Sequence, residues 1–236
     1  MSRNIRRIKK TELLEEEIIS FIILAAGSGK KIKSYEPRSL LKIKSGKTII
    51  ENQVSNAINN FKKVEVIAVI GCHASKIVKK QRCNTDLRFV ENQLYTSTNS
   101  SESLRLGLNN CLGRGVAFCH GDIIFNDKTL QVPYSKSFII VDSNNRINKD
   151  EIGVTKIRGK ASILSYGLSL KWAQIAFFTG KELRLLKSIM NKFEEKDKKK
   201  LSFEIINEII SLGGRFDCLE PEGMELKEID RIKDIK

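Results

Sequence analysis

A glycine-rich turn directly after a short apolar run is the first feature of this chain whose residue types could do chemistry. Residues 21–26 form a continuous apolar run, typical of a strand buried on both faces, and Lys30 and Lys31 follow the turn. Glycine lets the backbone approach an anion closely, and successive main-chain N–H groups bind phosphate oxygens. The strand end and the turn together are Leu24, Ala25, Ala26, Gly27, Ser28 and Gly29. The spacing is not that of a P-loop, so it leaves a phosphate site and a plain turn as equal alternatives.

Two carboxylates stand where buried strands are expected to end. Asp122 follows the apolar run 116–119, and Asp230 lies in the sequence Glu228–Ile229–Asp230 near the end of the chain. A carboxylate beside a buried strand is costly unless it is hydrogen-bonded, caps a helix or binds a metal. Mg²⁺ is usually held by one or two carboxylates together with substrate phosphates. The pair therefore suggests a magnesium site, with helix capping as the alternative.

The elements that must position these residues alternate along the chain. Apolar runs at 64–70, 87–90, 116–119 and 138–141 predict further strands, and helical spacing of apolar residues predicts helices at 50–61, 99–111, 179–193 and 202–212. Residues 152–170 indicate antiparallel strands or a hairpin. This pattern predicts an α/β fold, a three-layer α/β/α sandwich with a Rossmann-like, mostly parallel sheet and a small antiparallel addition. Ligands bind such sheets at the carboxyl ends of the strands.

Length and composition favour one globular domain. The chain has 236 residues, 41% hydrophobic and 30% charged, and a single core can grow to about 250 residues before it splits. We expect a basic appendage at residues 1–19 and a single domain at residues 20–236. No apolar run approaches the ~18 residues of a membrane span, and no secretory signal is visible, so we expect a cytoplasmic protein. Five widely spaced cysteines without a C-x-x-C pair predict neither disulfides nor a zinc site.

The formal net charge of +14 admits two interpretations, a nucleic-acid partner or a pocket for small anions such as nucleoside triphosphates. The cations crowd into residues 3–10 and 196–200, and both runs are most often plain solvated surface. No zinc finger or aromatic RNA-binding pattern accompanies them. A nucleic-acid partner is therefore the less favoured interpretation.

The same residues, in order, resemble the nucleotidyltransferases that activate sugar phosphates and phosphocholine. Residues 24–31 and 37–41 are similar to the family signature L-A-A-G-x-G-x-R followed by P-K-x-L, with Lys31 in place of the Arg and Arg38 in place of the Lys. Residues 91–104 resemble the N-P-x-Y-x-x-T-N and S-L stretch of the phosphocholine cytidylyltransferase branch. His120–Gly121–Asp122 resembles its G-D, and Glu228–Ile229–Asp230 its terminal E-I-D. The ordered set spans roughly residues 21–235.

The resemblance implies a fold, a reaction and a set of residues. It implies a nucleotidyltransferase fold like that of GT-A glycosyltransferases, and Mg²⁺-dependent transfer of a nucleoside monophosphate from a triphosphate, with CTP favoured. Lys31 and Arg38 would be catalytic, offsetting charge at the transferred phosphate, while Asp122 and Asp230 would hold Mg²⁺. The implied nucleotide-binding residues are Leu24, Ala25, Ala26, Gly27, Ser28, Gly29, Asn92, Ser103 and Gly121.

The acceptor implied by the resemblance is a small phosphorylated molecule, such as phosphocholine, a related phosphate or phosphonate, or a sugar phosphate. Tyr95, Asn99, Lys156 and Trp172 are its candidate ligands, the indole as part of a cation–π box. Such reactions supply precursors of cell-surface polysaccharides or lipids, and a homodimer is possible. Two alternatives stand beside this prediction: a glycosyltransferase that uses a nucleotide sugar, and a non-catalytic basic protein that binds nucleic acid.

Overall fold

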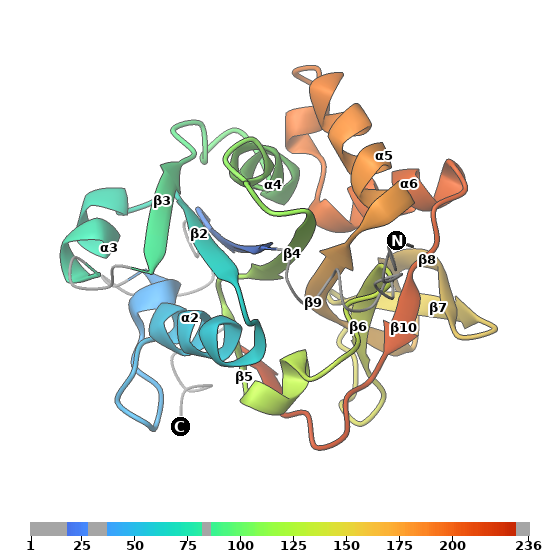
Figure 1. Cartoon of the computed structure of the whole chain (residues 1–236), viewed down its shortest axis with the longest axis horizontal. Helices are drawn as coiled ribbons and strands as arrows, with labels where there is room; N and C mark the ends of the chain where they lie inside the picture. Colours follow the sequence, from blue (N-terminus) through green and yellow to red (C-terminus); the bar gives the residue numbers. More distant parts are fainter. Residues whose placement is uncertain (1–17, 28–36, 82–85, 230–236) are drawn as a thin grey trace, which may run out of the picture.

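A central sheet with helices on both faces forms the fold, and the computed structural model describes residues 18–27, 37–81 and 86–229 (Figure 1). The strands are β1 (Ile19–Ala25), β2 (Val64–Ile70), β3 (Leu87–Glu91), β4 (Gly115–His120), β5 (Ile123–Phe125), β6 (Phe138–Asp142), β7 (Ile152–Ile157), β8 (Lys160–Tyr166), β9 (Leu170–Phe178), β10 (Asp217–Leu219) and β11 (Leu226–Glu228). The α-helices are α2 (Ile49–Asn60), α3 (Ala74–Lys80), α4 (Ser100–Leu108), α5 (Gly180–Asn191) and α6 (Ser202–Ser211). Short 3₁₀ helices are η1 (Arg38–Leu40), η2 (Asp127–Leu130) and η3 (Asp197–Lys199).

The strand order of the sheet is β3–β2–β1–β4–β9–β6–β10–β8–β7. Strands β3, β2, β1 and β4 are parallel neighbours, and β9 runs antiparallel between β4 and β6. β10 is parallel to β6, whereas β7 and β8 form an antiparallel hairpin. β5 and β11 make a separate two-stranded antiparallel sheet. The α/β class, the largely parallel sheet and the small antiparallel addition are therefore confirmed.

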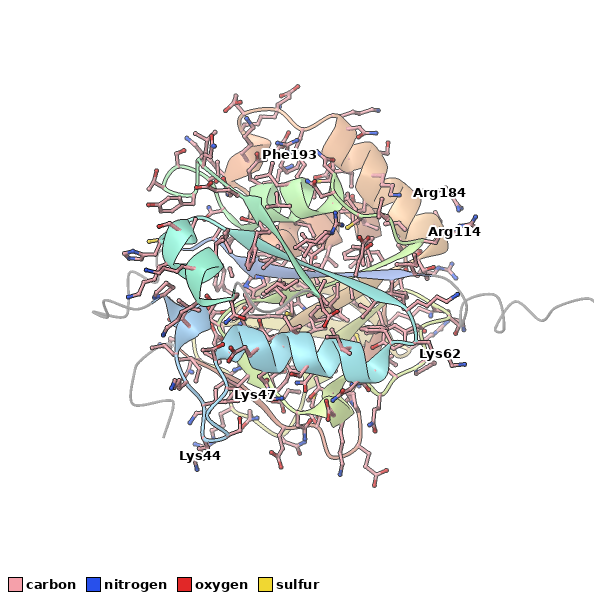
Figure 2. All side chains as sticks on the ribbon, turned by 60° about the vertical axis from the view of Figure 1, so that its left-hand side comes forward. Lys44, Lys47, Lys62, Arg114, Arg184 and Phe193 are labelled. Atoms are coloured by element: carbon pink, nitrogen blue, oxygen red, sulfur yellow. The ribbon has the colours of Figure 1, made fainter. Side chains whose placement is uncertain are left out.

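The two faces of the sheet carry separate hydrophobic cores. One core joins Ile22, Leu24 and Phe118 to apolar residues of α4, α5 and α6. The other joins Phe21 and Ile23 to apolar residues of α2 and to η2. Alternate residues of β1 thus enter opposite cores, as successive side chains of a strand must. Figure 2 shows α2 on one side of the sheet and α4 and α5 on the other, so the three-layer arrangement is confirmed.

The strands expected from apolar runs all form, while β5, β9, β10, β11 and helix α3 were not predicted. Helix caps differ from the simplest expectation. Thr179 precedes α5, but its side chain makes no capping hydrogen bond; its main-chain N donates to Ser137 Oγ at 2.9 Å, and Glu182 accepts from Ser137 Oγ at 3.0 Å. The last helix begins after Leu201, with Ser202 inside it. A capping box is present at Thr48 and Glu51, at the start of α2.

The surface cations lie on many different elements rather than on one. Lys44, Lys62, Arg114 and Arg184 are exposed and lie at the periphery of the molecule (Figure 2). The basic residues 1–17 of the predicted appendage lie outside the described residues. Among the helices described, none is long and apolar enough to cross a membrane.

Candidate functional site

A cavity of about 610 Å³ opens at the carboxyl ends of β1 and β4. This is the edge at which α/β sheets bind ligands, and the volume suits a small-molecule ligand. Separate parts of the sequence meet there, within residues 24–27, 37–39, 92–103 and 120–122 and at Leu201. The lining residues are Leu24, Ala25, Ala26, Gly27, Pro37, Arg38, Ser39, Asn92, Tyr95, Thr96, Thr98, Asn99, Ser100, Ser103, His120, Gly121, Asp122 and Leu201.

An ion pair between Arg38 and Asp122 forms one wall of this cavity. The Arg38 Nη1 atom lies 2.6 Å from Asp122 Oδ2, and the two side chains are 18% and 22% exposed. The second oxygen, Asp122 Oδ1, is buried and has no hydrogen-bond partner within the described ranges. A buried carboxylate oxygen without a donor is costly, so this atom is available for a ligand that carries positive charge.

Two glycines allow β1 to pack closely against its neighbours at the edge of the cavity. A Cβ atom on Gly121 would lie 2.7 Å from the Cβ of Ala25 and 2.9 Å from its Cα, and Gly121 N donates to Leu24 O at 2.9 Å. A Cβ on Gly71 would lie 2.7 Å from the Cβ of Tyr95. Gly27 differs, because a Cβ there would meet no atom of the described residues within 4 Å. The described part of the chain therefore leaves room beside Gly27 for an anion to approach the main chain.

Asn92 holds together the turn that carries the polar side chains of the cavity wall at residues 92–103. It is 2% exposed; its amide nitrogen donates to Thr98 Oγ1 at 3.1 Å and Ser103 Oγ at 3.2 Å, and its Oδ1 accepts from Leu94 N at 3.1 Å. These bonds use most of the hydrogen-bonding capacity of the side-chain amide within the protein. Asn92 thus shapes the wall of the cavity, and the hydroxyls of Thr98 and Ser103 are oriented by it.

The start of α4 is joined to the lysine-rich segment before α6. Asn99 N donates to Lys198 O at 2.8 Å, and the Asn99 side-chain amide donates to Lys199 O at 2.7 Å. Ser202 N donates to Ser100 Oγ at 2.8 Å. Leu201, the residue directly before Ser202, lines the cavity.

Comparison with known protein families finds a match in one segment of the chain. Residues 21–133 match the MobA-like NTP transferase domain family. This segment is therefore similar to that family. It contains the glycine turn, the Arg38–Asp122 pair and the Asn92 turn. Among curated proteins, none matches the sequence.

Solved structures extend the likeness to most of the chain. The CTP:phosphocholine cytidylyltransferase of Streptococcus pneumoniae has a TM-score of 0.73 at 17% identity, covering 92% of this chain and 95% of that one. The inositol-1-phosphate CTP transferase of T. maritima has a TM-score of 0.73 at 14% identity, covering 92% and 91%. The nucleoside-diphosphate-sugar pyrophosphorylase of Vibrio cholerae has a TM-score of 0.66 at 12% identity, covering 91% and 97%. At these identities the likeness establishes a shared fold.

Most of the described residues expected at the site lie together on the cavity of the transferase domain. They are Leu24, Ala25, Ala26, Gly27, Arg38, Asn92, Tyr95, Asn99, Ser103, Gly121 and Asp122. Ser28, Gly29, Lys31 and Asp230 lie outside the described residues. Sequence reasoning gave no role to Ser39, Thr96, Ser100, His120 or Leu201, which also line the cavity. Their only sequence signal is proximity to the motifs, except for Leu201, which tertiary contacts bring there.

Two residues expected at the acceptor do not line the cavity. Trp172 is 2% exposed, its indole nitrogen donates to Ile175 O at 3.1 Å, and its ring packs edge-on against Phe118. The expected cation–π box is wrong at this residue, because the neighbouring core encloses the ring. Lys156 is an exposed residue of β7, and the described lining does not include it. Its expected contact with the acceptor is not supported by its position.

His120 separates the buried Trp172 from the cavity. Its Nε2 lies 2.9 Å from Ser202 Oγ, and its ring centroid lies 5.9 Å from that of Trp172. Burial lowers the pKa of His120 from its usual value of 6.5, while the nearby Asp122 opposes that shift. The ring is therefore neutral at pH 7, and it is a hydrogen-bonding group of the wall rather than a fixed cation.

The residues present fit a divalent cation held with substrate phosphates. Asp122 offers the unpartnered Oδ1 toward such an ion. Ile229 N donates to the main-chain oxygen of Asp122 at 2.9 Å, so the chain lies beside Asp122 one residue before the predicted ligand Asp230. Within the described ranges, no cluster of three or more His, Cys, Asp or Glu side chains could form an all-protein metal cage. One or two carboxylates plus phosphate oxygens is the arrangement that Mg²⁺ commonly takes.

Proposed function

We propose that this protein transfers a nucleoside monophosphate, CMP from CTP, to a small phosphorylated acceptor and releases pyrophosphate. Phosphocholine, a related phosphate or phosphonate, and sugar phosphates are the acceptor candidates. The observation that carries the proposal is the convergence of the open Gly27 main chain, Arg38 and Asp122 on one cavity of a MobA-like NTP transferase domain. Main-chain N–H groups, a guanidinium and a carboxylate are the groups that recognise a triphosphate with its metal.

The chemistry needs positioning and charge compensation more than proton transfer. An oxygen of the acceptor phosphate attacks the α-phosphorus of the nucleotide, and the bond from that phosphorus to the bridging oxygen of the β-phosphate breaks. The acceptor phosphate is already ionised at neutral pH, so no general base is required. Arg38 neutralises charge on the phosphate that is transferred, and the Gly27 main chain binds the triphosphate. Lys31 is assigned a similar role from its place in the motif.

We further propose that Asp122 and Asp230 hold Mg²⁺. When bound, the ion neutralises the triphosphate and makes the α-phosphorus more electrophilic. With such an ion on Asp122, the Arg38 side chain, which is paired with Asp122 in this structure, would bind phosphate oxygens instead. The unpartnered Asp122 Oδ1 supports this assignment.

Calorimetric titration with CTP, UTP, ATP and GTP, each with Mg²⁺, tests the donor without knowledge of the acceptor. We expect selective binding of CTP, followed by pyrophosphate release when phosphocholine or sugar phosphates are added. Asp122→Asn is the matched control, since it keeps the size of the side chain and removes its charge. Failure of all four nucleotides to bind, in the presence of each acceptor, would overturn the proposal.

A further inference from the structure

The turn that carries Asp122 is fixed by a side chain of helix α2. The amide nitrogen of Gln53 donates to two main-chain oxygens, His120 O and Ile123 O, at 2.8 Å each. These carbonyls stand on either side of Gly121 and Asp122. Gln53 is fully buried, at 0% exposure. A single NH₂ group therefore joins both ends of the turn.

Gln53 is the first of three amides on one face of α2, which we call the amide ladder: Gln53, Asn56 and Asn60. Asn56 donates to Phe125 O at 2.6 Å, and Asn60 donates to Asp127 O at 3.2 Å. Their spacing of three and four residues places them on the same side of the helix. The ladder follows residues 120–127 from the turn through β5 to η2, and α2 lies beside β5 in Figure 1.

The far end of the ladder lies at the surface, and the near end lies at the cavity. Asn56 is 4% exposed, whereas the bond of Asn60 is exposed to solvent. The start of α2 is itself held in place, because Gln81 donates to Glu51 at 3.2 Å and the Thr48–Glu51 capping box closes the first turn. The helix is thus a fixed support from which Gln53 reaches the turn.

We propose that Gln53 is a positioning residue that sets the orientation of the Asp122 carboxylate toward the metal and the triphosphate. This inference rests on the proposed function. Two carbonyl oxygens that point at one nitrogen need a donor with two hydrogens, and an amide is the neutral side chain that supplies them. Without the donor, the two oxygens lose their shared partner and the turn opens. Shifts of about 1 Å in a reacting group cost large factors in rate, so a fixed turn matters for function.

The test compares Gln53→Met with Asn60→Ala in the full-length chain. Methionine has a similar length to glutamine and no hydrogen-bond donor. Asn60→Ala is the matched control, because it removes the solvent-exposed hydrogen bond of the amide ladder. Mn²⁺ binding in the presence of CTP is followed by electron paramagnetic resonance at 20 °C, with circular dichroism and thermal melts of each variant. We expect Gln53→Met to weaken Mn²⁺ binding about 10-fold, as is usual when a group that orients a metal ligand is removed. Asn60→Ala is expected to bind Mn²⁺ as the unchanged protein does.

Each outcome separates positioning from general stability and from the proposed function. A lower melting temperature of Gln53→Met with unchanged Mn²⁺ affinity would overturn the inference, since Gln53 would then serve the fold alone. Absence of Mn²⁺ and CTP binding in the unchanged protein would overturn the proposed function and this inference together. If Gln53→Met does not fold, Gln53→Asn is measured instead, because its shorter amide cannot reach both carbonyls. Failure of both variants to fold would also overturn the inference.

Discussion

A pair of glycine substitutions at the cavity separates packing from phosphate contact. In Gly121→Ala the new Cβ would lie 2.7 Å from the Cβ and 2.9 Å from the Cα of Ala25, and 3.0 Å from Leu24 O. None of these atoms belongs to a flexible side chain, so the strands must shift. In Gly27→Ala the new Cβ meets no atom of residues 18–27, 37–81 or 86–229 within 4 Å, and Gly27 is not among the residues with positive φ. The two changes are chemically identical but have different surroundings.

The expected magnitudes follow from those distances. Overpacking costs about 1–3 kcal/mol, so Gly121→Ala should lower the free energy of unfolding by that amount, and the melting temperature by about 2–4 °C for each kcal/mol. Gly27→Ala should leave the free energy of unfolding within about 0.5 kcal/mol of the original, or slightly above it. If a phosphate must approach the Gly27 main chain, the added methyl group costs a similar 1–3 kcal/mol in nucleotide affinity, roughly 5- to 150-fold.

Urea unfolding and calorimetric CTP titration of both variants provide the assay. Gly27→Ala is expected to lose affinity while it keeps stability, and Gly121→Ala is expected to lose stability. Equal stability of the two variants would refute the packing argument at Gly121. Unchanged CTP affinity in Gly27→Ala would show that phosphates do not contact this part of the turn.

Three further substitutions give distinct outcomes. Asp122→Asn should lower kcat about 100-fold or more with an unchanged circular dichroism spectrum, because it removes a carboxylate that would hold the Mg²⁺ needed to offset the charge of the triphosphate; retained pyrophosphate release would exclude Asp122 from the reaction. The lowered pKa of His120 means that the unfolded chain takes up a proton below about pH 6.5 while the folded chain resists it. Stability should therefore fall as pH drops from 7 to 5.5, and His120→Gln should reduce this slope in urea unfolding, the other titrating groups being common to both proteins. Trp172→Phe should lower the free energy of unfolding by about 1–2 kcal/mol, through the lost bond to Ile175 O and lost packing, and leave the acceptor KM unchanged. A changed KM for the acceptor would indicate that Trp172 contributes to acceptor binding.

The sequence predicted the elements that depend on local patterning. Continuous apolar runs gave the strands at 64–70 and 138–141 because a strand buried on both faces needs no alternation. It missed β9, which lies in the middle of the sheet between β4 and β6, and Gln174 within β9 has a positive φ of 58°. The register between β6 and β9 also shifts between Ile139 and Val141. Polar Lys171 and Gln174 interrupt the apolar residues of β9, so the strand does not stand out as one continuous apolar run.

At the candidate site, too, local features of the sequence were predicted and long-range contacts were missed. Ala25 and Asp122 were identified from residue type and from the expected ends of strands, and Arg38 from the resemblance to the nucleotidyltransferase signature; the three meet at the cavity. Trp172 was misplaced because residue type alone does not distinguish a ring on a pocket wall from a ring in a core. The amide of Gln53 received no role because its two partners are 67 and 70 residues away in the chain.

By itself, the sequence determined the α/β class, the glycine turn and the residue types available for binding a triphosphate, because these depend on composition and short-range spacing. Only the tertiary structure decided which of these groups meet. Arg38 and Asp122 are 84 residues apart in the chain, and their 2.6 Å contact exists because parallel strands bring their carboxyl ends to one edge. The lysine-rich segment is likewise joined to Asn99, about 100 residues earlier, by hydrogen bonds from Asn99 to Lys198 O and Lys199 O. Contacts of this kind depend on the packing of whole elements, which no local pattern encodes.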